Sequence, residues 1–222
     1  MASTNDFSYL VSAGPTREWI DPFRFISNPS SGKMGIAIAD EVYKHSNRIK
    51  LLHGVIDNSL LKDKAYECKS CETTNDLLRA MEKELSSDMI IFMAAAPSDF
   101  RPVSYSDQKI KKNSDRINIT FEKNPDILMH IAQLKLSGNY KNMITVGFAA
   151  ETQNTENYAL SKLKQKSLDF ICLNDISKKG VGFAGETNEV TIYCKSGEKI
   201  LIPMDTKVNV AKQIFHNVTR RI

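Results

Sequence analysis

The segment RFISNPSSGKMG, residues 24–35, places hydroxyl, amide and ammonium groups directly before a predicted helix. Small residues at a helix start leave backbone N–H groups free, and the helix dipole adds positive charge, so this segment is suited to bind a phosphate. The segment is not a P-loop, because Ser27 stands where that motif needs its first glycine and a methionine follows Lys33. An ordinary serine N-cap explains the same residues equally well.

Polar side chains also follow several predicted strands. In an open parallel sheet, ligands collect beyond the carboxyl ends of the strands, so these side chains should face one crevice. They supply cations for phosphates and carboxylates for a divalent ion. The residues expected in this crevice are Asn28, Lys33, Asp99, Lys109, Glu151, Asn174 and Asp175.

The elements that position these groups alternate between strand-like and helical runs. Strands are predicted at 9–14, 48–54, 65–71, 88–96, 116–122, 143–151 and 169–175, and helices at 32–46, 74–87, 125–136 and 155–166. A hairpin at 188–203 and a last helix to Arg220 follow. This order predicts a single α/β domain over residues 1–222, with a Rossmann-like doubly wound, mainly parallel sheet, flanking helices and a C-terminal β-hairpin. The long connections at 15–30, 97–115 and 176–187 are typical of functional loops.

The composition narrows the function classes. A net charge of +4 suits small anionic substrates but is too diffuse for a nucleic-acid arm or a membrane patch, and KIKK at 109–112 is a short basic run. No stretch approaches ~18 consecutive apolar residues, and the first residues do not form a signal peptide. We therefore expect a cytoplasmic protein that has neither nucleic acid nor a membrane as partner.

The four cysteines do not form a metal framework. Cys68 and Cys71 make one C-x-x-C, but Cys172 and Cys194 fall singly in predicted strands. Ordinary thiols in a reducing compartment are the favoured interpretation over a redox or metal role.

Seven sequence blocks, in this order along nearly the whole chain, resemble the phosphopantothenate–cysteine ligase family. They are SAGPTREWIDPFRFISNPSSGKMG, AAAPSDFRPV, KIKK, FEKNPDIL, VGFAAET, KLKQKSLDFICLND and GVGFAGETNEVTIY. The resemblance implies that 4'-phosphopantothenate is joined to L-cysteine in coenzyme A biosynthesis. KIKK and NPDIL resemble the bacterial branch, which cleaves CTP to CMP and pyrophosphate through an acyl-cytidylate, rather than the eukaryotic branch, which uses ATP.

The same resemblance implies cofactors and partners. Mg²⁺ or Mn²⁺ would accompany CTP, and the family's dimers imply a homodimer. Because the chain starts at the ligase's first strand, we expect a stand-alone bacterial form without a fused decarboxylase domain, and a separate phosphopantothenoylcysteine decarboxylase as its pathway neighbour.

The resemblance also implies residue roles. Lys109 would be a mobile cation at the activated carboxyl group, Asp99 an oxygen ligand for the metal, and Asn28 a donor to the acyl oxygen. Arg24 would hold the substrate phosphate, across a dimer interface. The nucleotide-binding residues implied are Gly14, Ser30, Ser31, Gly32, Lys33, Ala95, Ala96, Asn124, Asp126, Ile127, Phe148, Lys162 and Lys166. Family members use no protein nucleophile, so none of the four cysteines is expected to be catalytic.

Ordinary structural roles compete with these assignments. A basic run in a loop is usually a solvated surface, an aspartate after a strand often caps a turn, and lysines on one helix face are commonly solvated. Two other functions stay open as well. Tyr158 and Lys162 match the Tyr-x-x-x-Lys of short-chain dehydrogenases, with Thr145 at the distance of their serine, although Gly14 is not followed by the glycine cluster of a nicotinamide site. A catalytically silent nucleotide-binding protein is the third candidate.

Overall fold

A computed structural model describes residues 7–111, 116–151, 155–175 and 185–222. Its centre is an eight-stranded sheet in the order β12-β11-β10-β9-β6-β1-β4-β5. The strands from β10 to β5 run parallel, and the hairpin of β11 and β12 extends the β10 edge in the antiparallel sense. The bounds are β1 (Ser8–Ala13), β4 (Ile49–His53), β5 (Glu67–Ser70), β6 (Met89–Met93), β9 (Ile144–Glu151), β10 (Phe170–Asp175), β11 (Thr187–Cys194) and β12 (Lys199–Thr206).

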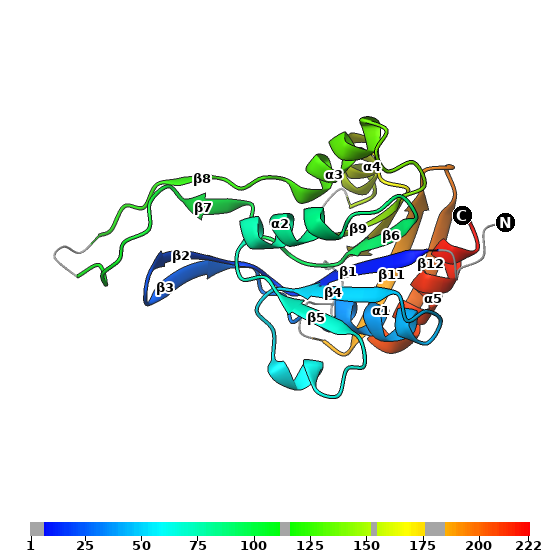
Figure 1. Cartoon of the computed structure of the whole chain (residues 1–222), viewed down its shortest axis with the longest axis horizontal. Helices are drawn as coiled ribbons and strands as arrows, with labels where there is room; N and C mark the ends of the chain where they lie inside the picture. The colour runs from blue at the N-terminus through cyan, green and yellow to red at the C-terminus, as the bar shows by residue number, and fades with distance from the viewer. Residues whose placement is uncertain (1–6, 112–115, 152–154, 176–184) are drawn as a thin grey trace.

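Helices cover both faces of this sheet (Figure 1). α1 (Lys33–Tyr43) and α5 (Lys207–Thr219) pack on one face, and α2 (Thr74–Glu84), α3 (Ile127–Leu136) and α4 (Thr155–Gln165) cover the other. Successive side chains of a strand point to opposite faces, so each layer has its own apolar core. In β1, Val11 lies in the core under α1 and α5, and Leu10 lies in the other core. The architecture confirms the predicted Rossmann-like fold and its C-terminal hairpin.

Two of the helices begin at residues whose side chains accept hydrogen bonds from the first backbone N–H groups. Thr73 and Asp76 form a capping box at α2, and Asp126 accepts a hydrogen bond from Met129 N at the start of α3. The short 3₁₀ helix η2 (Asn58–Leu61) stands on the connection between β4 and β5. Within the described residues, no helix has both the length and the apolar character needed to cross a membrane.

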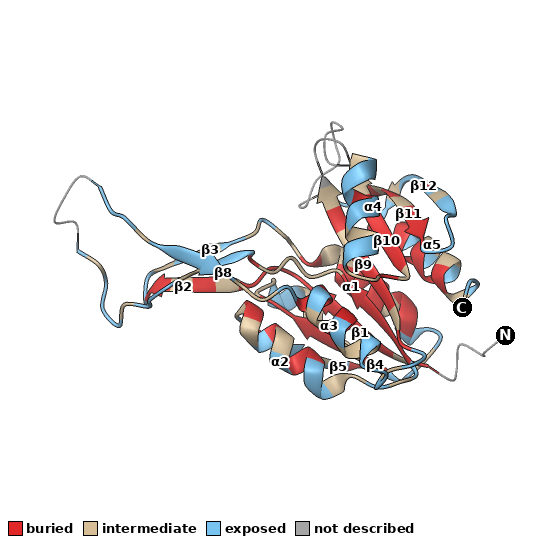
Figure 2. Ribbon diagram, turned by 90° about the horizontal axis from the view of Figure 1, so that it is seen from above, coloured by how far each residue is buried: buried red, intermediate tan, exposed pale blue. Residues whose placement is uncertain are grey.

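Two small antiparallel pairs leave the body as an extended arm, drawn at the left of Figure 1. β2 (Arg17–Asp21) pairs with β3 (Arg24–Ser27), and β7 (Phe100–Pro102) pairs with β8 (Phe121–Lys123). Figure 2 shows that the buried residues gather in the body, while exposed residues dominate the arm.

The arm corrects two sequence-based expectations. Residues 15–30, expected to be a connection, contain the β2–β3 hairpin. The strand expected at 116–122 is reduced to β8, which pairs with β7 rather than with the central sheet. The expected loop at 176–187 lies mostly outside the described residues, as does Lys112 at the end of the KIKK run.

Asp21 ties the two halves of the arm together. Its side chain is buried and accepts hydrogen bonds from Phe23 N (2.9 Å), Arg24 N (3.0 Å) and Ile110 N (3.1 Å), and it forms an ion pair with the Arg24 guanidinium. Arg24 also donates to the Ile110 carbonyl at 3.0 Å. Hydrogen bonding from Arg24, followed by that from the backbone amides, holds the pKa of Asp21 well below its usual range.

Trp19 joins the arm to the body. It stands on β2, its indole Nε1 donates to Glu72 Oε1 at 3.0 Å, and its ring meets the Phe25 ring edge-on with 5.1 Å between centroids. The guanidinium of Arg17 lies 4.3 Å from the centroid of the same Phe25 ring. The root of the arm is therefore an aromatic and ionic cluster rather than an apolar core.

Candidate active site

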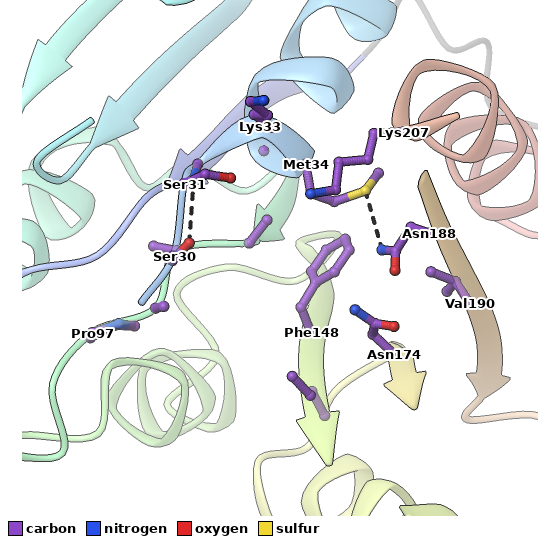
Figure 3. Close-up of a pocket in the computed structure, with 17 residues that line it drawn as sticks. Ser30, Ser31, Lys33, Met34, Pro97, Phe148, Asn174, Asn188, Val190 and Lys207 are labelled. Carbon is purple, nitrogen blue, oxygen red and sulfur yellow. Dashed lines mark hydrogen bonds between the residues drawn. The ribbon is translucent and has the colours of Figure 1, made fainter. Parts of the chain in front are cut away.

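Two adjoining cavities open at the carboxyl ends of the parallel strands, where the sheet topology predicts a ligand. The first has a volume of about 250 Å³ and lies between the start of α1 and strands β6, β9, β10 and β11 (Figure 3). The second, of about 500 Å³, lies between the segment after β6 and the start of α3. Ala95, Pro97 and Phe148 line both cavities. The two spaces therefore share a wall and suit a large ligand or two ligands side by side.

The first cavity is bordered by the predicted phosphate-binding segment. Ser30, Ser31, Gly32 and Lys33 line it, and α1 begins directly after Gly32. Gly32 has a φ of 77°, and a Cβ atom there would lie 3.3 Å from Gly14 Cα. Gly14, with a φ of 76°, thus supports the helix start from below rather than lining the cavity. The positive φ favours glycine at both positions, and a Cβ at Gly14 would also overlap Ile56 Cγ2.

Asn28 lies beside this border and is held by the strand end opposite. Its side-chain Nδ2 donates to Pro97 O at 2.9 Å and to Ala96 O at 3.3 Å. The amide therefore fixes the backbone at the shared wall of the two cavities. Ala95 and Ala96, both predicted to bind nucleotide, line the first cavity at this point.

The first cavity also contains residues that the sequence did not single out. Asn188 from β11 and Lys207 from α5 line it, together with the predicted Asn174. Lys33 forms an ion pair with Glu186. Nothing in the sequence pattern predicts that Asn188 and Lys207 line this cavity. Asn188 reaches it because β11 pairs with β10, and Lys207 because α5 packs against α1.

The second cavity contains the predicted carboxylates. Asp99, Asn124, Asp126 and Lys166 line it, with Ile127. Asp126 combines two structural bonds: it caps α3, and its Oδ2 lies 2.8 Å from Lys166 Nζ. Asn124 donates to Ser98 O at 2.9 Å, while its buried Oδ1 has no hydrogen-bond partner among the described residues. Asp99 is exposed.

A divalent ion fits this cavity only in part. Among the described residues no group of three or more His, Cys, Asp or Glu is placed to hold a metal. Asp99 and Asp126 are the carboxylates of the second cavity, and the second is already bonded to Lys166. Such a donor set suits Mg²⁺ that keeps several waters and takes its other ligands from substrate phosphates.

The arm carries two predicted site residues away from both cavities. Lys109 Nζ lies 4.7 Å from the centroid of the Phe23 ring, and Arg24 is bound to Asp21. Neither residue lines the first or the second cavity. In the single chain, Lys109 therefore does not lie beside Asp99 in the second cavity, because residues 97–111 follow the arm outward. The role expected for Lys109 stays a prediction.

The other residues predicted for the site are not seen to line either cavity. Lys162 on α4 lines neither of them, and the side chains of Glu151 and Asp175 lie outside the described part of the structure. Tyr158 is 51% exposed, whereas Thr145 is 1% exposed and bonded to Asp169. The dehydrogenase pattern is thus not assembled into a site.

The two cysteines of the C-x-x-C segment lie on opposite faces of the sheet. Cys68 packs against the core under α1 and α5, and Cys71 belongs to the core on the opposite face of the sheet. All four cysteines are free thiols.

The fold and the cavities define a Rossmann-like α/β protein with its crevice at the carboxyl ends of the strands. Residues 4–222 match the family model described as DNA/pantothenate metabolism flavoprotein C-terminal domain (DFP). The chain belongs to this family, which confirms the resemblance seen in the sequence.

Known proteins of similar sequence or structure agree. The coenzyme A biosynthesis bifunctional protein CoaBC of Vibrio vulnificus (strain YJ016) is 38% identical over 215 residues, which is 96% of this chain and 52% of that protein. The crystal structure of the C-terminal domain of a CoaBC protein is 33% identical, with a TM-score of 0.78, and the match covers 96% of this chain and 94% of that one. A flavoprotein of the same description from Streptococcus pneumoniae shares the fold, with a TM-score of 0.79, 18% identity and coverage of 97% and 100%. The chain spans about half the length of the CoaBC protein that it matches.

Proposed function

We propose that this chain is a phosphopantothenate–cysteine ligase of coenzyme A biosynthesis, which uses CTP. The observation that carries the proposal is the pair of cavities with a common wall, in a chain of the family that includes the C-terminal domain of CoaBC. Amide formation from a carboxylate needs an activating nucleotide beside the acid. Two adjoining cavities, one with Lys33 on its wall and the other with Asp99 and Lys166, offer room for both molecules.

In the first step, a carboxylate oxygen of 4'-phosphopantothenate attacks the α-phosphorus of CTP. The new P–O bond forms as the bond to the bridging oxygen of the β-phosphate breaks, so pyrophosphate leaves and an acyl-cytidylate remains. The start of α1 with Lys33, and Lys166 at the second cavity, would neutralise the crowded phosphates. Asp99 would hold Mg²⁺, which supplies charge neutralisation to the phosphates when bound.

In the second step, the amine of L-cysteine attacks the acyl carbon, CMP leaves, and the amine loses a proton to give the amide. Asn28 lies at the shared wall, where its amide would turn from a backbone carbonyl to the acyl oxygen as negative charge develops there. This step needs no protein nucleophile, and the four thiols stay outside the reaction.

The arm residues enter through a second copy of the chain. Several large apolar side chains are exposed on the arm, among them Phe23, Phe100 and Tyr105. A homodimer formed through the arms would cover them and place Arg24 and Lys109 at the partner's cavities, which their own chain does not do. Arg24 would then bind the substrate phosphate and Lys109 the activated carboxyl group.

The proposal extends to the surroundings of the enzyme. We expect a cytoplasmic homodimer, and a phosphopantothenoylcysteine decarboxylase that consumes the product. The preference for CTP over ATP belongs to the same proposal.

The test is pyrophosphate release with Mg²⁺, 4'-phosphopantothenate and L-cysteine, with CTP and ATP compared and each substrate omitted in turn. Release that requires phosphopantothenate and favours CTP is the expected result. Nucleotide binding without release would instead identify a silent nucleotide-binding protein, and equal release with ATP would contradict the CTP preference. Release that continues with chelator present would remove Mg²⁺ from the proposal.

A further inference from the structure

One wall of the first cavity comes from the C-terminal part of the chain. Asn188 stands near the start of β11, and Lys207 is the first residue of α5. Figure 3 shows Lys207 reaching toward the start of α1, with Asn188 beside Met34 and Asn174 nearby. These side chains face the same space as Ser30 and the other residues of the predicted phosphate-binding segment.

Lys207 is a buried cation in a positive environment. The residue is only 7% exposed, and burial lowers the pKa of its ammonium group. The charge of Lys33 lowers this pKa further, whereas Glu186 raises it. Glu186 is itself bound to Lys33, with its side chain 78% exposed. Lys33 and Lys207 thus repel each other at this wall, and an anion bound in the cavity would lessen the repulsion.

Asn188 adds an unsatisfied acceptor to the same wall. The residue is 4% exposed, and its buried Oδ1 has no hydrogen-bond partner among the described residues. Its Nδ2 faces the weakly accepting Met34 Sδ at 3.7 Å. A register shift between Asn188 and Val190 marks a bulge, a feature that re-aims side chains beside functional sites. Buried polar atoms are rarely left unpaired, so this oxygen suits an N–H or O–H group of a ligand.

We propose that Lys207, together with Lys33, binds the phosphate of a substrate in the first cavity, and that Asn188 accepts a hydrogen bond from the same molecule. The backbone N–H groups at the start of α1 complete the anion site. The inference rests on the proposed function, which supplies two phosphate-bearing substrates. One is a phosphate monoester, 4'-phosphopantothenate, and the other is CTP; both also carry hydroxyl or N–H donors for Asn188.

The test compares each substrate with its dephosphorylated form. Calorimetric titration measures binding of 4'-phosphopantothenate against pantothenate, and of CTP against cytidine. Lys207→Met removes the charge at similar length, and Lys207→Arg keeps it. Lys212→Met, on the exposed side of the same helix, is the matched control. Urea unfolding establishes that each variant is folded.

We expect Lys207→Met to weaken binding of the phosphorylated member of one pair on the order of 10- to 100-fold, while its dephosphorylated member is unaffected. Lys207→Arg should restore most of this affinity, and the affected pair identifies the substrate. A second variant, Asn188→Leu, should weaken both members of that pair alike. In Lys207→Met, unchanged binding, or a loss that is equal for both members of a pair, would overturn the inference even where the wild-type protein releases pyrophosphate. A wild-type protein that binds neither substrate would overturn the proposed function instead.

Discussion

At the scale of single residues, the candidate site combines fixed backbone with side chains that already have partners. Asn28 donates to two carbonyls, and Asp126 serves a helix cap and an ion pair. Such bonds keep the shared wall of the cavities in place before any ligand arrives, which reduces the ordering cost of binding.

Asn28→Asp should slow amide formation more than activation. The substitution keeps the size of the side chain but removes its N–H donors, so the acyl oxygen loses a partner when charge develops on it, at a cost of about 10²-fold in rate. Single-turnover pyrophosphate release without cysteine reports activation, and product formation after cysteine is added reports the second step. Asn47→Asp, at an exposed position away from the cavities, is the control. An equal decrease in both steps would remove the oxyanion role.

Gly35→Ala should destabilise the fold, because α1 crosses β1 without room for a side chain. A Cβ atom there would lie 2.6 Å from Ala13 Cβ and 2.7 Å from Ser12 O. We expect a loss of about 1–3 kcal/mol in the free energy of unfolding, measured with urea. In the matched variant Gly147→Ala, the close neighbour is the flexible end of Leu168, so the loss should be smaller. A Gly35 variant as stable as the Gly147 variant would mean that α1 can shift.

The thiols should react slowly in the folded protein. Burial raises the pKa of all four cysteines, so less thiolate is present near neutral pH than in free cysteine. Reaction with a disulfide reagent at pH 7.5, chosen as about one unit below the usual thiol pKa, should be slower than for free cysteine and should accelerate for every thiol in urea. One fast native thiol would contradict the structural interpretation and reopen a redox role.

At the scale of elements, the body was predictable from the sequence and the arm was not. The helical period of α1 and the continuous apolar run at β6 predict their type, because burial on one helix face or on both sides of a strand sets these patterns. β2 and β3 are runs of five and four residues around an Asp-Pro turn, too short to show a period. The alternation at 116–122 does predict an extended chain, but pairing depends on which partner lies near.

The candidate site likewise has a part that was predictable from the sequence and a part that was not. The start of α1 and the ends of β6 and β9 were predictable, because position on a parallel sheet follows from strand order. The approach of Asn188 and Lys207 depends on how the terminal hairpin and α5 fold back on α1, which is long-range packing. The position of Lys109 depends on the course of the arm.

Asp21→Asn should loosen the arm and leave the body intact. One carboxylate accepts from three backbone amides and from Arg24, and an amide side chain has a single oxygen to offer. Amide hydrogen exchange at Phe23, Arg24 and Ile110 should become faster, on the order of tenfold or more, while exchange in β1 and β6 is unchanged. Asp107→Asn, exposed in the same segment, is the control. Faster exchange throughout the sheet would contradict a local role.

The pH dependence of this junction follows from the same pKa. A folded-state pKa below the unfolded value of about 3.9 means that the stabilisation is fully present above that pH and is lost as the pH falls through the lowered value. Exchange at the junction, corrected for the intrinsic rate, should therefore stay constant from about pH 5 to pH 8.

At the scale of the whole molecule, the proposed homodimer would combine the cavities of one chain with the arm of the other. Mixing Arg24→Ala with Asn28→Asp, each of which is expected to have little activity alone, should restore activity if Arg24 acts on the partner's cavities. After subunit exchange in a symmetric dimer, half of the dimers are mixed and each has one intact site, so about a quarter of the wild-type activity should return. The same mixture with Lys109→Gln in place of Arg24→Ala tests Lys109. No recovery, despite a dimeric mass, would place both residues in the site of their own chain.

Trp19 gives the arm a signal of its own. It is the single tryptophan of the chain, and it stands on β2 between Phe25 and Glu72. Fluorescence excited at the red edge of the absorption band therefore comes from Trp19 in the arm, and the body contributes no tryptophan emission. Quenching, spectral shifts and anisotropy of the unlabelled protein can follow association and substrate binding at the root of the arm in real time, separately from changes in the sheet.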